Sequence, residues 1–68
     1  MTPIMYSKNN CPLCDVLREK LTAAGIEYTE VKDIDELRAM GIDRTPVLKV
    51  DGKMMYLAEA NKWIKDRS

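Results

Sequence analysis

Residues 4–31 read IMYSKNNCPLCDVLREKLTAAGIEYTEV, and this stretch decides the fold. The apolar run Ile4–Tyr6 predicts a brief strand that is followed by a loop. Apolar residues then recur at helical spacing over 12–24, and Gly25 stands where a helix ends. Residues 26–31 alternate between apolar and polar side chains, which is typical of a half-buried strand. A strand, a helix and a second strand in this order predict that the two strands pair in parallel.

A short second helix is predicted to begin at Asp33, because Glu36 follows at the spacing of a capping box. Gly41 marks its end. Acidic residues are frequent around its start, and a charge run of this kind usually faces solvent. We therefore expect a solvated face formed by Glu27, Glu30, Asp33, Asp35 and Glu36.

Residues 46–50 and 53–56 are two further strand candidates, and Asp51-Gly52 between them is the signal of a tight antiparallel hairpin. A last helix is predicted after the hairpin, with one apolar face formed by Leu57, Ala60, Trp63 and Ile64. The complete order is βαβ-α-ββα, which predicts an α/β fold with a four-stranded mixed sheet and three helices.

Composition excludes several classes of protein. With 68 residues the chain forms one small domain over 1–68, and its 11 basic and 11 acidic residues cancel, which argues against a nucleic-acid partner. No histidine is present, so catalytic triads and histidine metal sites are excluded. Neither a signal peptide nor an apolar run of the ~20 residues that span a bilayer is visible, and a secreted domain this small would normally carry more than two cysteines. We expect a cytoplasmic protein with no membrane partner.

The segment Cys11-Pro12-Leu13-Cys14 carries the chemistry. It lies where the loop meets the first helix, with Cys11 or the residue before it as the N-cap and Pro12 at or near the first helical position. Free backbone N–H groups and the helix dipole there favour a thiolate, and such motifs lower the cysteine pKa from about 8.5 to roughly 3.5–7.5. Lys8 in the same loop adds a positive charge near the sulfur.

Cys11 is therefore expected to be the nucleophile. Cys14 lies on the apolar side of the first turn, so it should be more buried and suited to resolving a mixed disulfide by attacking Cys11. Asp15 acts in the opposite direction, because a nearby carboxylate disfavours a thiolate. The residues favour a dithiol–disulfide oxidoreductase that reduces protein disulfides.

Three alternatives remain open. As a structural staple, a disulfide across so few residues would stabilise the chain by only about 2 kcal/mol. A closed zinc site needs four ligands, so two cysteines would hold a metal or an iron–sulfur cluster only if a second subunit completed the site. The domain could also be a redox-inert interaction module. No metal site is expected within one chain, and no cofactor other than the redox-active disulfide.

Two segments support a family resemblance. Residues 6–14, YSKNNCPLC, resemble the active-site segment of glutaredoxins, and Thr45-Pro46-Val47 is similar to the cis-proline loop of the thioredoxin superfamily. The resemblance covers essentially the whole chain and implies a thioredoxin fold with Cys11 as nucleophile and Cys14 as resolving thiol. It further implies that Pro46 is cis and packed against the disulfide, and that the backbone of Thr45 pairs with an extended substrate. Leu13, where glutaredoxins usually have Tyr or Phe, is assigned to the same substrate-binding surface.

The chain is also similar to the short NrdH-redoxins. That resemblance implies a thioredoxin reductase as electron source and ribonucleotide reductase as the protein that receives the electrons. Glutaredoxins carry Gly-Gly and an Asp after the fourth strand, where residues 54–60 read MMYLAEA, and the NrdH motif Trp-Ser-Gly-Phe-Arg-Pro has no match. Either glutathione or a reductase is therefore expected to supply the electrons, and the protein is expected to act as a monomer.

Overall fold

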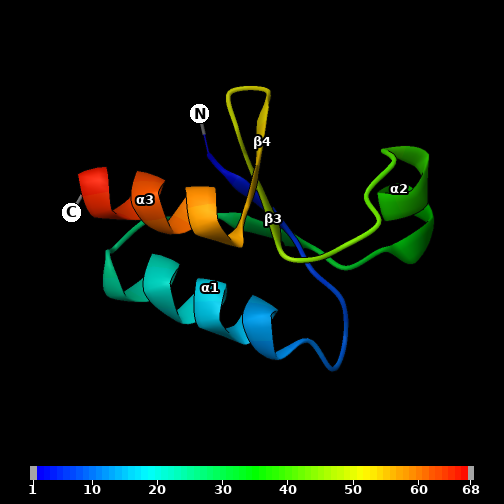
Figure 1. The fold of residues 1–68 in the computed structure, drawn as a ribbon, viewed down its shortest axis with the longest axis horizontal. Helices are drawn as coiled ribbons and strands as arrows, with labels where there is room; N and C mark the ends of the chain where they lie inside the picture. The colour runs from blue at the N-terminus through cyan, green and yellow to red at the C-terminus, as the bar shows by residue number, and fades with distance from the viewer. Residues whose placement is uncertain (1, 68) are drawn as a thin grey trace.

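The computed structural model describes residues 2–67 and confirms the predicted order of elements (Figure 1). Met1 and Ser68, the two ends of the predicted domain, lie outside the described residues. Three helices and four strands follow one another as β1 (Ile4–Tyr6), α1 (Pro12–Ala23), β2 (Thr29–Val31), α2 (Ile34–Ala39), β3 (Val47–Val50), β4 (Lys53–Tyr56) and α3 (Leu57–Arg67).

The four strands form one mixed sheet in the order β2-β1-β3-β4. β1 pairs in parallel with β2 and antiparallel with β3, and the hairpin of β3 and β4 is antiparallel. β1 is therefore an inner strand, with Met5 opposite Glu30 on one side and Leu48 on the other. The loop that carries Cys11 follows β1 directly, so the cysteines lie beyond the C-terminal end of this inner strand.

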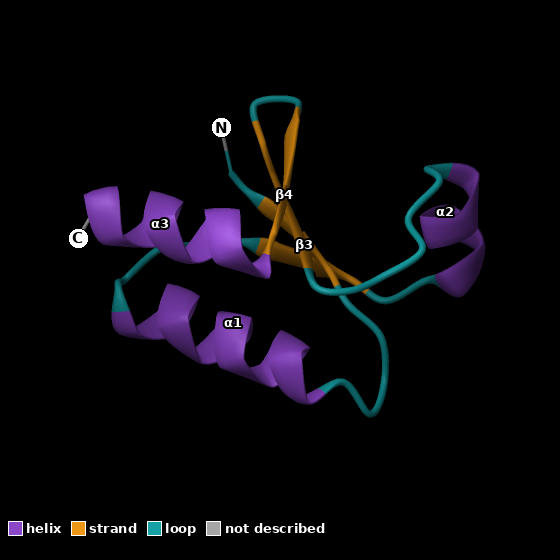
Figure 2. Cartoon of the chain, in the orientation of Figure 1, coloured by secondary structure: helices purple, strands orange, loops and turns teal. Residues whose placement is uncertain are grey.

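The helices cover the two faces of the sheet unequally. Figure 2 shows α1 and α3 side by side and α2 apart from them. Because side chains alternate along a strand, Met5 contributes to the core under α1 and α3, whereas Tyr6 contributes to a smaller core with Leu37 of α2. The larger core holds the buried residues Met5, Cys11, Cys14, Leu17, Leu21, Leu48, Met55, Ala60 and Ile64.

The second strand is shorter than predicted, because β2 begins at Thr29 and not at residue 26. The backbone N–H of Ile26 donates to the carbonyl of Leu21 at 3.0 Å, so this residue still completes the end of α1. Pairing with the first strand begins only where the N–H of Thr29 donates to the carbonyl of Pro3 at 2.9 Å. The alternating pattern was nevertheless informative, since Ile26 and Tyr28 pack against the larger core from the loop.

β3 and β4 form the antiparallel hairpin that the Asp51-Gly52 sequence predicted. Asp51 and Gly52 both have positive φ, 49° and 85°, as the tightest two-residue turns require. β3 begins at Val47, one residue later than predicted, since Pro46 has no N–H to donate to a neighbouring strand.

The ends of the helices follow the predicted caps. The carboxylate of Asp33 accepts hydrogen bonds from the N–H groups of Asp35 at 2.9 Å and Glu36 at 3.4 Å, so Asp33 is the N-cap of α2. Gly25 follows α1 with a φ of 71°, the left-handed conformation that glycine adopts most easily. Within residues 2–67, no helix combines the length and the apolar character that crossing a membrane requires.

Candidate active site

Cys11 is the N-cap of α1. Its backbone is extended, with φ −119° and ψ 96°, and its Sγ accepts a hydrogen bond from the N–H of Cys14 at 3.1 Å. Pro12 occupies the first helical position, where the N–H that it lacks would have no partner within the helix. Cys11 and Cys14 are joined by a disulfide, and their Cα atoms lie 5.2 Å apart.

The two cysteines differ in their exposure to solvent. Cys11 is 9% exposed, whereas Cys14 is fully buried at 0% and belongs to the larger core with Leu17. A reacting molecule can therefore approach the disulfide only from the side of Cys11. Cys14 is thus the more buried of the two, as predicted, whereas the order of attack, with Cys11 first and Cys14 resolving, stays a prediction.

The fold brings Thr45 to the disulfide from a distant part of the sequence. Its Oγ1 lies 3.5 Å and its carbonyl oxygen 4.0 Å from the Sγ of Cys11. The Thr45-Pro46 peptide bond is cis, as the family resemblance implied, and Pro46 is buried. Beside this loop the guanidinium of Arg44 lies over the ring of Tyr56, 5.0 Å from its centroid, a cation–π contact that the sequence did not predict.

Leu13 and Lys8 are the remaining predicted site residues. Leu13 lies between the two cysteines in the chain, on the first turn of α1, and is 53% exposed. Lys8 lines a hollow with Thr45 and Arg38 of α2, so its side chain is near the Thr45 loop. Among the described residues no contact joins Lys8 to either sulfur, and its effect on the thiolate stays a prediction.

A cluster of charged residues beside the cysteines was missed by the sequence reasoning. Arg18 of α1 donates to Glu30 of β2 through Nε at 3.0 Å and Nη2 at 2.6 Å, and to Asp15 through Nη1 at 2.6 Å. The hydroxyl of Ser7, a residue with 0% exposure, also donates to Glu30 at 2.7 Å. These four residues tie the start of the cysteine loop and the first turn of α1 to the second strand.

Glu30 therefore does not belong to the solvated acidic face that was expected. Its side chain is 21% exposed, and the hydrogen bonds from Arg18 lower its pKa to about 2, with a further contribution from Ser7. The same bonds raise the pKa of Arg18. The spacing of Asp15 and Arg18, three residues apart on one helix, was the available signal for half of this cluster. The contact with Glu30 joins two elements that only the folded chain brings together.

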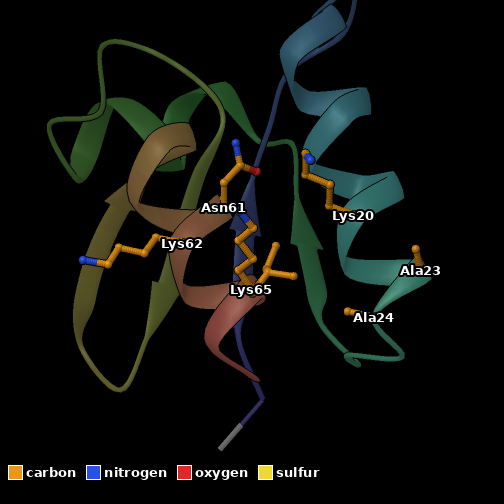
Figure 3. Close-up of a pocket in the computed structure, with 7 residues that line it drawn as sticks. Lys20, Ala23, Ala24, Asn61, Lys62 and Lys65 are labelled. Carbon is orange, nitrogen blue, oxygen red and sulfur yellow. The ribbon is translucent and has the colours of Figure 1, made fainter. Parts of the chain in front are cut away.

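A hollow between two helices lies away from the cysteines. It measures about 650 Å³ and lies between the C-terminal half of α1 and α3 (Figure 3). Lysines line both sides of it, Lys20 from α1 and Lys62 from α3, and the Oδ1 of Asn61 is buried there without a hydrogen-bond partner among residues 2–67. The cysteines lie at the opposite end of α1, so this hollow is not part of the candidate active site.

Comparison with known proteins agrees with this geometry. The family model described as glutaredoxin-like domain (DUF836) matches residues 3–67. No curated protein matches the chain. The matched range includes every strand, both cysteines and the Thr45-Pro46 loop. The chain therefore belongs to the glutaredoxin-like domain family.

Proposed function

We propose that this glutaredoxin-like domain is a dithiol–disulfide oxidoreductase that reduces disulfides of other proteins. The observation that carries the proposal is the arrangement of the cysteine pair. Cys11 caps α1 and is 9% exposed, and Cys14, which is fully buried in the same core, is joined to it in a disulfide. Such a pair can exist as a disulfide and as two thiols, which is what two-electron exchange requires.

In the reaction we propose, the Cys11 thiolate attacks one sulfur of the substrate disulfide. A mixed disulfide forms, and the other substrate sulfur leaves as a thiolate that takes up a proton. The Cys14 thiol then loses its proton and attacks the Sγ of Cys11, which releases the second substrate thiol and closes the Cys11–Cys14 disulfide. The substrate gains two electrons from the domain and two protons, one that Cys14 loses in this step and one from solvent, which took up the proton of Cys11 when its thiolate formed.

The surroundings of Cys11 favour a protein substrate. Leu13 is exposed on the first turn of α1, and Thr45 Oγ1 lies 3.5 Å from the Sγ of Cys11, so both residues are available to an extended chain that reaches the sulfur. Pairing of such a chain with the backbone of Thr45 is part of the proposal, and so is thiolate stabilisation by Lys8 and by the start of α1 at Pro12. Ribonucleotide reductase is one such substrate to test.

The electrons must come from a second thiol. Glutathione and a thioredoxin reductase are the two donors that we propose to compare, by following reduction of the Cys11–Cys14 disulfide with each under the same conditions. Faster reduction by one of the two donors would identify it as the electron source of the domain. Negligible rates with both would indicate another dedicated reductase.

Reduction of insulin disulfides tests the activity itself. We expect Cys11→Ser to abolish reduction, because no attacking sulfur remains at the surface. We expect Cys14→Ser to accumulate mixed disulfides at Cys11, which mass spectrometry detects. Ala23→Ser, on the exposed side of the same helix, serves as the matched control and should leave the rate unchanged. Full activity of Cys11→Ser would contradict the proposed function.

A further inference from the structure

The charged cluster beside the cysteines includes a carboxylate on the same helical turn as Cys14. The N–H of Asp15 donates to the carbonyl of Cys11 at 3.2 Å, which places Asp15 in the first turn of α1, next to Cys14 in the chain. A carboxylate in this position opposes the formation of a thiolate by like-charge repulsion. A positive partner for Asp15 would weaken this repulsion and favour the thiolate of Cys11.

Arg18 is the positive partner of Asp15, and Glu30 of β2 holds its guanidinium in place. Its Nη1 binds Asp15, while its Nε and Nη2 bind the two carboxylate oxygens of Glu30. Glu30 also accepts the bond from Ser7, at the start of the cysteine loop, and lies 3.7 Å from the ammonium group of Lys32. The guanidinium is held between a strand and a helix, so its charge stays beside Asp15.

We propose that Arg18 is a positioning residue of the cysteine site, which neutralises Asp15 and fixes the cysteine loop through Glu30, and thereby favours the thiolate of Cys11. Arg18 acts through Asp15 and Glu30, because among the described residues no contact joins it to either sulfur. The inference rests on the proposed function, since it concerns the reactivity of the sulfur that we propose as the nucleophile.

Alkylation of the reduced protein tests the inference without a disulfide substrate. The full chain is reduced with dithiothreitol, desalted and treated with iodoacetamide over a range of pH, and mass spectrometry follows the label on Cys11. We expect Arg18→Gln to move the pH profile to higher pH and to slow labelling at neutral pH about threefold, the effect of one uncompensated charge at several ångströms near a surface. Glu30 and Lys32 of the cluster, and Lys8 and Arg44 near Thr45, are the same in every variant.

Three further variants separate charge from structure. We expect Arg18→Lys to restore the pH profile, because lysine keeps the charge although it loses the forked contact with Glu30. Adding Asp15→Asn to Arg18→Gln should also restore it, since the unpaired carboxylate is then gone. Arg67→Gln removes a positive charge from the last residue of α3, where Arg67 lies over Trp63, and is the matched control that should change nothing.

The inference would be wrong if Arg18→Gln lowered the resistance to urea but kept the pH profile of the unmodified protein, because Arg18 would then only stabilise the fold. If that variant does not fold, Asp15→Asn alone decides, since it leaves the contact of Arg18 with Glu30 in place. A shift of its profile to lower pH would support the inference, because the charge of Arg18 is then no longer balanced by Asp15, and an unchanged or higher profile would refute it. Failure of the proposed function is a separate result, in which the unmodified protein labels at Cys11 but does not reduce insulin.

Discussion

Replacing Glu30 by Gln should remove a pH-dependent part of the stability. The pKa of Glu30 falls from an ordinary 4.5 to about 2 in the folded chain, chiefly because Arg18 donates two hydrogen bonds to it. A carboxyl group whose pKa is lower in the folded chain than in the unfolded chain stabilises the folded chain. This stabilisation is fully present at pH values above the pKa of the group in the unfolded chain. This contribution is therefore complete above about pH 4.5 and is lost as the pH falls towards 2.

The size of the effect follows from the shift and from the exposure of the pair. At 1.36 kcal/mol for each pH unit, the shift corresponds to at most about 3 kcal/mol. The side chains of Arg18 and Glu30 are 30% and 21% exposed, so solvent screening reduces the expected contribution to about 1 kcal/mol. In a small domain this corresponds to a change of about 1 M in the urea midpoint.

Urea unfolding of the oxidised protein, measured from pH 7 down to pH 2, tests this reasoning. The unmodified chain should lose about 1 kcal/mol more over the acidic range than Glu30→Gln does. Glu27→Gln, an exposed carboxylate in the segment before β2, is the matched control and should follow the unmodified chain. Parallel pH curves for the unmodified protein and Glu30→Gln would refute the assigned role of the Arg18–Glu30 pair.

Three further substitutions have defined outcomes. Leu48→Ala removes a side chain with 0% exposure from the central core and should cost 2–5 kcal/mol, roughly the entire stability of a small domain, so circular dichroism should show an unfolded or barely folded chain. Asp33→Ala removes the N-cap of α2 and should lower the free energy of unfolding by about 1 kcal/mol in urea, without changing the alkylation of Cys11. Leu13→Ala should raise KM for insulin and leave the alkylation rate unchanged, because Leu13 is exposed and would contact only the substrate; an unaltered KM would remove Leu13 from the substrate surface.

The order of elements could be predicted because most helix ends and the hairpin turn have a local signal. Gly25 and Gly41 stop two helices, Asp33 starts one, and Asp51-Gly52 makes the hairpin turn. Each signal acts through the backbone of its own few residues, so no tertiary information is needed. The start of the second strand could not be predicted in this way, since it depends on a hydrogen bond from the N–H of Thr29 to the carbonyl of Pro3, the residue before β1.

In the candidate active site, too, the local features could be predicted and the contacts between distant residues could not. The cap at Cys11 and the burial of Cys14 follow from their positions in one helical turn. The approach of Thr45 to the sulfur spans 34 residues and came only from the family resemblance. The contact of Arg18 with Glu30 had no signal at all, because alternation and charge patterns do not tell which charged residue of a strand meets which residue of a helix.

The sheet order has a consequence for self-association. Its two outer strands, β2 and β4, have only three and four residues, and β2 carries a charged residue at its centre. Open strand edges are where chains add to one another to form aggregates, and short, charged edges discourage this. A second copy that paired with β2 or β4 would form few backbone hydrogen bonds, because these strands are short. Both outer strands can therefore be open to solvent without acting as a template for fibrils.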